Sequence, residues 1–268
     1  MELLRLLIGT IALRPYVFIF FAVYLFIAIS SIGWKRTAIF TLLAYLIAFS
    51  CEYASSHGNS GIPFGVYRYI ESTRNRELWI AGVPFMDSLS FTFLSFISYE
   101  YASLLLSPLA VSRRDIVVMR QSRVRHSFRV AALAGFLMMY LDIIIDPVTL
   151  QGRRWFLGEI YYYPNGGPYF GVTIANFLGW FIVCAGIVLV FIAIEKLMGI
   201  CGNEPAVWRY PFQGLAPVAL YFGVLAFNLW VTFRIGESSL AWAGVFICLP
   251  LLLMTVLTVC RTNGQIQQ

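Results

Sequence analysis

Seven long apolar runs constrain the fold of this chain more than any other feature. Each run is long enough, or nearly so, to cross the roughly 30 Å hydrocarbon core of a bilayer as a helix. The runs cover residues 15–32, 37–54, 81–107, 127–148, 170–195, 213–232 and 239–260. No alternation suited to a β-barrel is found, so we predict an all-α polytopic bundle of about seven transmembrane helices. No polar stretch is long enough to fold alone, and we expect residues 1–268 to form a single integral membrane domain.

The composition agrees with a membrane protein. Hydrophobic residues make up 60% of the chain and charged residues 12%, whereas soluble domains carry about 45–50% and about 25%. A net charge of +6 would suggest nucleic-acid binding in a soluble protein. Here the basic residues lie mostly in short loops, where they set membrane orientation. We therefore expect the lipid bilayer as a partner and no nucleic acid.

The distribution of basic residues predicts the orientation. One set of loops carries the denser group, which comprises Lys35, Arg36, Arg113, Arg114, Arg120, Arg123, Arg125, Arg129, Lys196, Arg209 and Arg261. The other set carries Arg5, Arg14, Arg68, Arg74, Arg76, Arg153, Arg154 and Arg234. The first side should be cytoplasmic, which places the C-terminus in the cytoplasm and the N-terminus outside the inner cell membrane. The run 15–32 exceeds a signal-peptide core, so we expect a retained helix.

Carboxylates within the apolar runs are the main candidates for chemistry. The five that lie in or at the ends of these runs are Glu52, Asp87, Glu100, Asp142 and Asp146. Each costs about 2.5–3.5 kcal/mol at a helix centre, and no Lys or Arg occupies the middle of a run to neutralise them. An unpaired carboxyl in a low dielectric tends to keep its proton. Such a group is the proton donor that acid catalysis on an alkene requires.

Four of these carboxylates are predicted to meet. Glu52 ends the second helix, Asp87 begins the third, and Asp142 and Asp146 close the fourth on one helix face, because they are four residues apart. Glu100 lies near the opposite end of its helix. A single interfacial carboxylate is easily explained as structural, whereas the convergence of four favours a site.

Two long loops, 53–80 and 147–169, lie on the same face as the four carboxylates. They are rich in Gly, Pro and aromatic residues, so we expect them to fold back onto the bundle. The aromatics near Asp146 are Tyr161, Tyr162, Tyr163, Trp155, Phe156, Tyr169, Phe170 and Trp180. An interfacial belt explains most of them; alternatively, they line a polyene pocket and stabilise a carbocation. Asn176 could orient water or a carboxyl, or join two helices.

Several classes of protein are excluded. The chain has no nucleotide-binding glycine motif, no P-loop and no GxSxG. Two histidines are too few for a di-iron oxidase, no lysine lies mid-span for a retinal Schiff base, and the five cysteines form no CxxC pair. Asp142 and Asp146 match the DxxxD motif of intramembrane prenyltransferases, but the second Asp-rich stretch that those enzymes use is missing, which disfavours that class. We predict no metal and no cofactor.

Two motifs resemble the signatures of a known family. The first joins Glu52, Gly61-Ile-Pro-Phe-Gly-Val-Tyr-Arg-Tyr69, Gly82-Val-Pro84 and Asp87. The second joins Asp142-Ile-Ile-Ile-Asp146-Pro147, Trp155 and Tyr169-Phe-Gly-Val-Thr-Ile-Ala-Asn-Phe-Leu-Gly-Trp180. Together, over residues 50–182, they resemble carotenoid biosynthesis membrane proteins that include γ-carotene 1′-hydroxylase and bisanhydrobacterioruberin hydratase. The chain departs from that pattern at Thr173-Ile174, where a Pro is common, and by a longer insert at 161–168, which leaves the substrate open.

The resemblance implies a cofactor-independent hydratase that adds water to a terminal C=C bond of an acyclic carotenoid, with other carotenoid enzymes as partners. We expect Asp146 or Asp142 to protonate the alkene, and Glu52 or Asp87 to position and deprotonate the water. The expected substrate-binding residues are Phe64, Tyr67, Trp155, Tyr169, Phe170, Asn176 and Trp180.

Other functions stay open at the level of the sequence. A proton-initiated lycopene cyclase would form a similar cation and quench it with the chain's own alkene. A proton-coupled transporter or a lipophile-binding protein would use the carboxylates as a relay. A purely structural membrane protein is disfavoured by the four converging acids.

Overall fold

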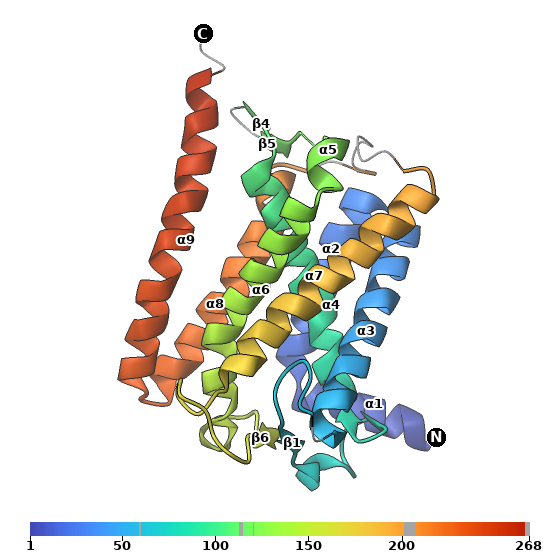
Figure 1. The fold of residues 1–268 in the computed structure, drawn as a ribbon, viewed down its shortest axis with the longest axis vertical. Coiled ribbons are helices and arrows are strands. Elements are labelled where there is room, and N and C mark those ends of the chain that lie inside the picture. Colours follow the sequence, from blue (N-terminus) through green and yellow to red (C-terminus); the bar gives the residue numbers. More distant parts are fainter. Residues whose placement is uncertain (59, 113–114, 120, 201–206, 209, 266–268) are drawn as a thin grey trace.

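The computed structural model describes residues 1–58, 60–112, 115–119, 121–200, 207–208 and 210–265 (Figure 1). Four of the basic residues used to predict the orientation lie outside the described residues, as does one of the five cysteines. They are Arg113, Arg114, Arg120, Arg209 and Cys201.

Seven helices of the described residues are long and apolar enough to cross a membrane. They are α2 (Pro15–Ile32), α3 (Trp34–His57), α4 (Phe85–Leu106), α6 (Phe128–Thr149), α7 (Ile174–Leu197), α8 (Ala216–Arg234) and α9 (Ser238–Gln265). Each overlaps one of the seven predicted apolar runs. The prediction of an all-α polytopic bundle is confirmed.

Helix α4 occupies the centre of the bundle, whereas α9 lies at its edge (Figure 1). The central position suits a helix rich in serine, because small side chains let neighbouring helices approach closely. Two of its serine hydroxyls bond within the helix: Ser95 donates to the Phe91 carbonyl at 2.5 Å and Ser103 to the Tyr99 carbonyl at 2.9 Å, whereas the buried Ser98 hydroxyl has no partner among the described residues. Because α4 is central, its first turn places Asp87 inside the bundle, near one end.

Helices α6 and α7 pack closely through small residues. A Cβ atom on Gly135 would lie 2.6 Å from the Phe181 carbonyl oxygen and 3.2 Å from the Ala185 Cβ. Ala131, one turn earlier, is fully buried. This contact brings the end of α6, with Asp142 and Asp146, alongside the start of α7, with Asn176.

The two long loops fold back and pair with each other at one end of the bundle. Strand β1 (Arg68–Tyr69) runs antiparallel to β6 (Tyr161–Tyr162), with Tyr69 opposite Tyr161. A second short pair, β2 (Trp79–Ile80) and β3 (Val83–Pro84), leads into α4, and the 3₁₀ turns η1 (Glu71–Thr73) and η2 (Gly152–Arg154) complete the loops. The predicted fold-back is present, and it covers the end of the bundle that carries the four carboxylates.

Helix α1 (Glu2–Leu13) crosses this same end (Figure 1). Its Thr10 hydroxyl accepts a hydrogen bond from the Leu78 amide at 2.7 Å. Arg14, which follows it, was expected in a loop but is buried and pairs with Glu77 at 3.1 Å. The helix therefore holds the loop that precedes α4.

The opposite end holds α5 (Ser122–Arg125), the strands β4 (Leu109–Ser112) and β5 (Asp115–Val118), and the turn η3 (Gln213–Leu215). Arg125 reaches inward from α5 and binds the Glu100 carboxylate at 2.8 Å. Arg36 and His126 bind Glu195 nearby. The expectation that Glu100 lacks a cationic partner is wrong, because an arginine at the end of the bundle can fold inward to meet it.

Candidate active site

The four carboxylates predicted to converge do so. Glu52 lies in the last two turns of α3, Asp87 in the first turn of α4, and Asp142 and Asp146 in the last two turns of α6. Glu52, Asp142 and Asp146 are buried and Asp87 is partly buried. Helix ends therefore bring them together beneath the paired loops.

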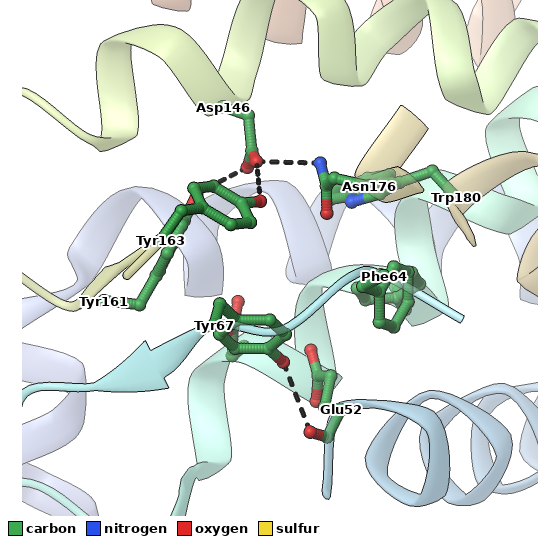
Figure 2. Close-up of a pocket in the computed structure, with 10 residues that line it drawn as sticks. Glu52, Phe64, Tyr67, Asp146, Tyr161, Tyr163, Asn176 and Trp180 are labelled. Atoms are coloured by element: carbon green, nitrogen blue, oxygen red, sulfur yellow. Dashed lines mark hydrogen bonds between the residues drawn. The ribbon is translucent and has the colours of Figure 1, made fainter. Parts of the chain in front are cut away.

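A polar cavity of about 30 Å³ lies between three of these carboxylates, Glu52, Asp87 and Asp146 (Figure 2). This volume has room for one or two water molecules. Its lining residues are Glu52, Phe64, Tyr67, Asp87, Phe91, Asp146, Tyr161, Tyr163, Asn176 and Trp180. In Figure 2, Asp146 lies on one side of the cavity, with Glu52 and Tyr67 on the other.

Asp146 is held by three hydrogen-bond donors. The Tyr161 hydroxyl donates to Oδ1 at 2.5 Å, and the Tyr163 hydroxyl donates to Oδ2 at 2.9 Å. The Asn176 amide nitrogen donates both to Asp146 Oδ2, at 2.8 Å, and to Asp142 Oδ2, at 2.6 Å. Within the described residues, Asp142 Oδ1 is buried without a hydrogen-bond partner. Asn176 thus bridges the two aspartates and orients both carboxyls.

The start of α7 explains how Asn176 reaches this position. Thr173 is the N-cap residue of α7, and its hydroxyl accepts a hydrogen bond from the backbone N–H of Asn176 at 3.3 Å. Threonine is a favoured N-cap residue because its oxygen satisfies a free amide of the first turn. The departure from the family pattern at Thr173 therefore gives the helix a polar cap.

Asp87 and Glu52 have their own hydroxyl donors. The Tyr69 hydroxyl donates to Asp87 Oδ2 at 2.7 Å, and the Tyr67 hydroxyl lies 3.2 Å from that of Tyr69. The Ser88 hydroxyl donates to Glu52 Oε2. Since Ser88 follows Asp87 directly in the chain, the first turn of α4 supplies both one carboxyl of the site, Asp87, and the hydroxyl that binds another, Glu52.

The tyrosines of the site keep their protons at neutral pH. Burial raises the pKa of Tyr67, Tyr69, Tyr161 and Tyr163 well above the usual value near 10, and the neighbouring carboxylates raise it further. Tyr69, Tyr161 and Tyr163 therefore act as hydrogen-bond donors to the carboxyls, and Tyr67 donates to the Glu52 backbone carbonyl at 3.3 Å, rather than any of them acting as a base.

A second cavity, of about 80 Å³, is largely apolar and shares Asp87, Asp146, Tyr161 and Trp180 with the first. Its remaining lining residues are Tyr16, Val17, Phe20, Met86, Ser90, Phe93, Leu94, Ile145, Thr149, Trp155, Ile160, Val224 and Asn228. Asp87 and Asp146 thus line both a polar and an apolar space.

Three aromatic side chains form one wall of the polar cavity. Phe91 contacts Phe64 with ring centroids 5.6 Å apart and Trp180 at 4.5 Å. This packing depends on Gly179, because a Cβ atom there would lie 2.6 Å from Phe64 Cδ1 and 2.7 Å from the Pro63 carbonyl oxygen. The glycine allows the loop after α3 to lie directly on α7.

Most of the predicted site residues lie at these two cavities. Asp142 lines neither and lies behind Asp146, to which the Asn176 bridge joins it. Trp155 lines the apolar cavity. Tyr169 and Phe170 line neither cavity; their rings contact each other at 5.0 Å, and Phe170 is 44% exposed.

Some residues of the site were not predicted individually. They are Tyr16, Phe20, Tyr69, Ser88, Phe91 and Asn228, whereas Tyr161 and Tyr163 were named only within the aromatic group near Asp146. The alternation in Tyr161-Tyr162-Tyr163 is a usable signal, because the first and third side chains of an extended segment point to the same side. Asn228 offers no comparable signal, since one amide in an apolar run is often only a helix-packing group.

The fold and the site together define a multi-pass membrane protein with an acidic site buried at one end of its bundle. Residues 4–255 match the sequence model of the family described as carotenoid biosynthesis protein, and the chain belongs to this family. The match confirms the resemblance seen over residues 50–182 and extends it to the later helices. It assigns the protein a role in carotenoid metabolism. No curated protein and no solved structure matches the chain.

Proposed function

We propose that this protein is a cofactor-independent carotenoid hydratase, which adds water across a terminal C=C bond of an acyclic carotenoid. One observation carries the proposal: Asp87 and Asp146 line both a polar cavity with room for water and an apolar cavity rich in aromatic side chains. Hydration of an alkene needs a carboxylic acid beside an apolar end group and a water molecule within reach of the same carbon.

Asp146 is the proposed acid. It lines the apolar cavity, whereas Asp142 lies behind it. The carboxyl proton forms a C–H bond at the less substituted alkene carbon, which leaves a tertiary cation and an Asp146 carboxylate. The Asn176 bridge and the two tyrosine hydroxyls hold that carboxylate as charge develops on it. Asp142 shares the bridge and supports the protonated state of the pair.

The cation is stabilised by its surroundings and then captured by water. Trp180 and Tyr161 line both cavities, and their ring faces attract a positive charge. The water oxygen forms a bond to the tertiary carbon, and one of its protons passes to the Asp87 carboxylate, with Glu52 as the second acidic group that positions water. The proton returns from Asp87 to Asp146 through water in the polar cavity, so the reaction adds one H₂O and leaves the protein unchanged.

A cyclase would use the same protonation and differ in how the cation is quenched. The polar cavity favours capture by water, because three tyrosine hydroxyls and three carboxyl groups line it and can bind a water molecule. The product separates the two functions, since hydration adds the mass of water and cyclisation leaves the mass unchanged. A transporter or lipophile-binding protein would return the polyene unaltered.

We further propose that the site lies at the outer side of the inner cell membrane. The opposite end of the bundle carries Lys35, Arg123, Arg129 and Lys196, and positively charged loops normally remain cytoplasmic. The C-terminus is then cytoplasmic. Enzymes that make acyclic carotenoids in the same membrane would supply the substrate.

Expression in a lycopene-producing host tests the proposal. Mass spectrometry of the pigments should show a gain of one or two waters. Asp146→Asn should abolish this gain, while Glu71→Gln should retain it, because Glu71 is an exposed carboxylate bound to Arg74 at the surface. A pigment of unchanged mass with altered retention would indicate cyclisation, and unaltered lycopene would contradict activity on this substrate.

A further inference from the structure

A buried amide lies in the apolar cavity, on a helix that carries neither family motif. Asn228 is on α8, is 6% exposed, and lines the cavity together with Asp87 and Asp146. An amide in an apolar cavity beside two carboxyls requires an explanation, because buried polar groups normally have hydrogen-bond partners.

The hydrogen bonds of Asn228 leave one atom without a partner. Its amide nitrogen donates to the Val224 carbonyl of the same helix at 2.9 Å. Its amide oxygen has no hydrogen-bond partner among the residues that the structure describes. The side chain therefore joins no two helices, and its free acceptor is available to the cavity it lines.

The protein groups around the cavity do not supply the missing donor. The Ser90 hydroxyl donates to the Met86 carbonyl and the Thr149 hydroxyl to the Ile145 carbonyl, each at 2.9 Å. Both hydroxyl protons are therefore in use within their own helices. The Tyr16 hydroxyl also lines the cavity but makes no hydrogen bond to Asn228 among the described residues, so the amide oxygen is open to a donor from a ligand in the cavity.

We propose that the Asn228 amide oxygen holds the water molecule that attacks the carbocation. The inference rests on the proposed hydratase function. The water oxygen bonds to the tertiary carbon, one O–H proton passes to the Asp87 carboxylate, and the other O–H stays hydrogen-bonded to Asn228. The same oxygen thus becomes the tertiary hydroxyl of the product, still bound to the amide. Asn228 is a positioning residue, and it transfers no proton.

A residue that only positions the water affects hydration of the alkene and leaves its protonation intact. Without the amide, the cation still forms beside Asp146 but more often loses a proton and returns to the alkene. In D₂O the exchangeable acid proton is deuterium, so each futile cycle can leave deuterium on a carbon of the recovered substrate. Replacement of a residue with a merely structural role would lower hydration and deuterium exchange together.

The experiment compares Asn228→Leu with Thr232→Val in the full-length protein, with lycopene as the substrate in D₂O. Thr232 is an apt control, because it is buried on the next turn of α8, its hydroxyl donates to the Asn228 backbone carbonyl, and it lines neither cavity. We expect Asn228→Leu to lower the hydrated product by about tenfold or more, with deuterium still entering the recovered lycopene. Thr232→Val should hydrate at nearly the wild-type rate.

Asn228→Ala, which removes the acceptor and adds no bulk, gives the same test if the leucine variant does not fold. Hydration at the wild-type rate in either variant would overturn the assignment, as would a parallel loss of hydration and deuterium exchange while Thr232→Val stays active. A wild-type protein with neither product nor exchange would overturn the hydratase proposal itself and this inference with it.

Discussion

Tyr69 and Tyr161 face each other across the two-stranded ladder that joins the long loops, and each hydroxyl donates to a different carboxyl of the site. Tyr69 binds Asp87 at 2.7 Å and Tyr161 binds Asp146 at 2.5 Å. The ladder thus fixes the separation of the two groups that line both cavities. The paired loops act as part of the site rather than as connections between helices.

Removal of one of these hydroxyls should slow the reaction without unfolding the protein. Tyr161→Phe takes a donor from Asp146, and a hydrogen bond to a charged group contributes about 1.5–3 kcal/mol. We expect turnover to fall by about 10- to 100-fold. Tyr162→Phe is the matched control, because Tyr162 is exposed and its substitution should leave turnover unchanged. Equal turnover in the two variants, measured by product formation, would contradict a role for the ladder.

The close approach at Gly179 predicts a second pair of variants. Gly179→Ala would push the new Cβ into Phe64 and the Pro63 backbone, and overpacking of this kind costs about 1–3 kcal/mol. We expect lower turnover and a lower thermal unfolding midpoint. Gly186→Ala, on the same helix with no atom within 4 Å of the added Cβ, should be neutral or slightly stabilising. Loss of activity in both variants would show that α7 rejects alanine for another reason.

The buried tyrosines predict how stability falls in alkali. Burial raises the pKa of Tyr67, Tyr69, Tyr161 and Tyr163 in the folded state, whereas the unfolded chain loses these protons near pH 10. Their contribution is therefore complete below about pH 10 and is lost as the pH rises from there through the raised values. The unfolding midpoint, followed from about pH 8 to about pH 11, should fall more steeply in the wild type than in Tyr67→Phe. Identical slopes would indicate that Tyr67 titrates in its ordinary range.

The parts of this architecture that depend on local pattern could be predicted from the sequence. Seven apolar runs suffice for seven helices, and the spacing of Asp142 and Asp146 suffices to place both on one face of α6. The small residues Ala131 and Gly135, four positions apart, are likewise a pattern typical of a helix-packing face, and Gly135 lies against α7.

Features that depend on long-range contacts could not be predicted. The pairing of Tyr69 with Tyr161 joins segments more than ninety positions apart, and no periodic pattern encodes it. Arg125 and Glu100 illustrate the same limit, because a long arginine side chain can reach a carboxylate from outside the apolar run. Tyr169 and Phe170 were predicted at the substrate site from their aromatic character and their place in the second motif, and neither feature fixes the direction in which a loop side chain points.

The source of the oxygen in the product tests the central claim most directly. The purified protein would be incubated with lycopene in H₂¹⁸O under ordinary air, and the product examined by mass spectrometry. Our account predicts one ¹⁸O atom in every new hydroxyl of the wild-type product, with the product absent from Asp146→Asn. A hydroxyl without the label, or a product of the same mass as lycopene, would contradict it.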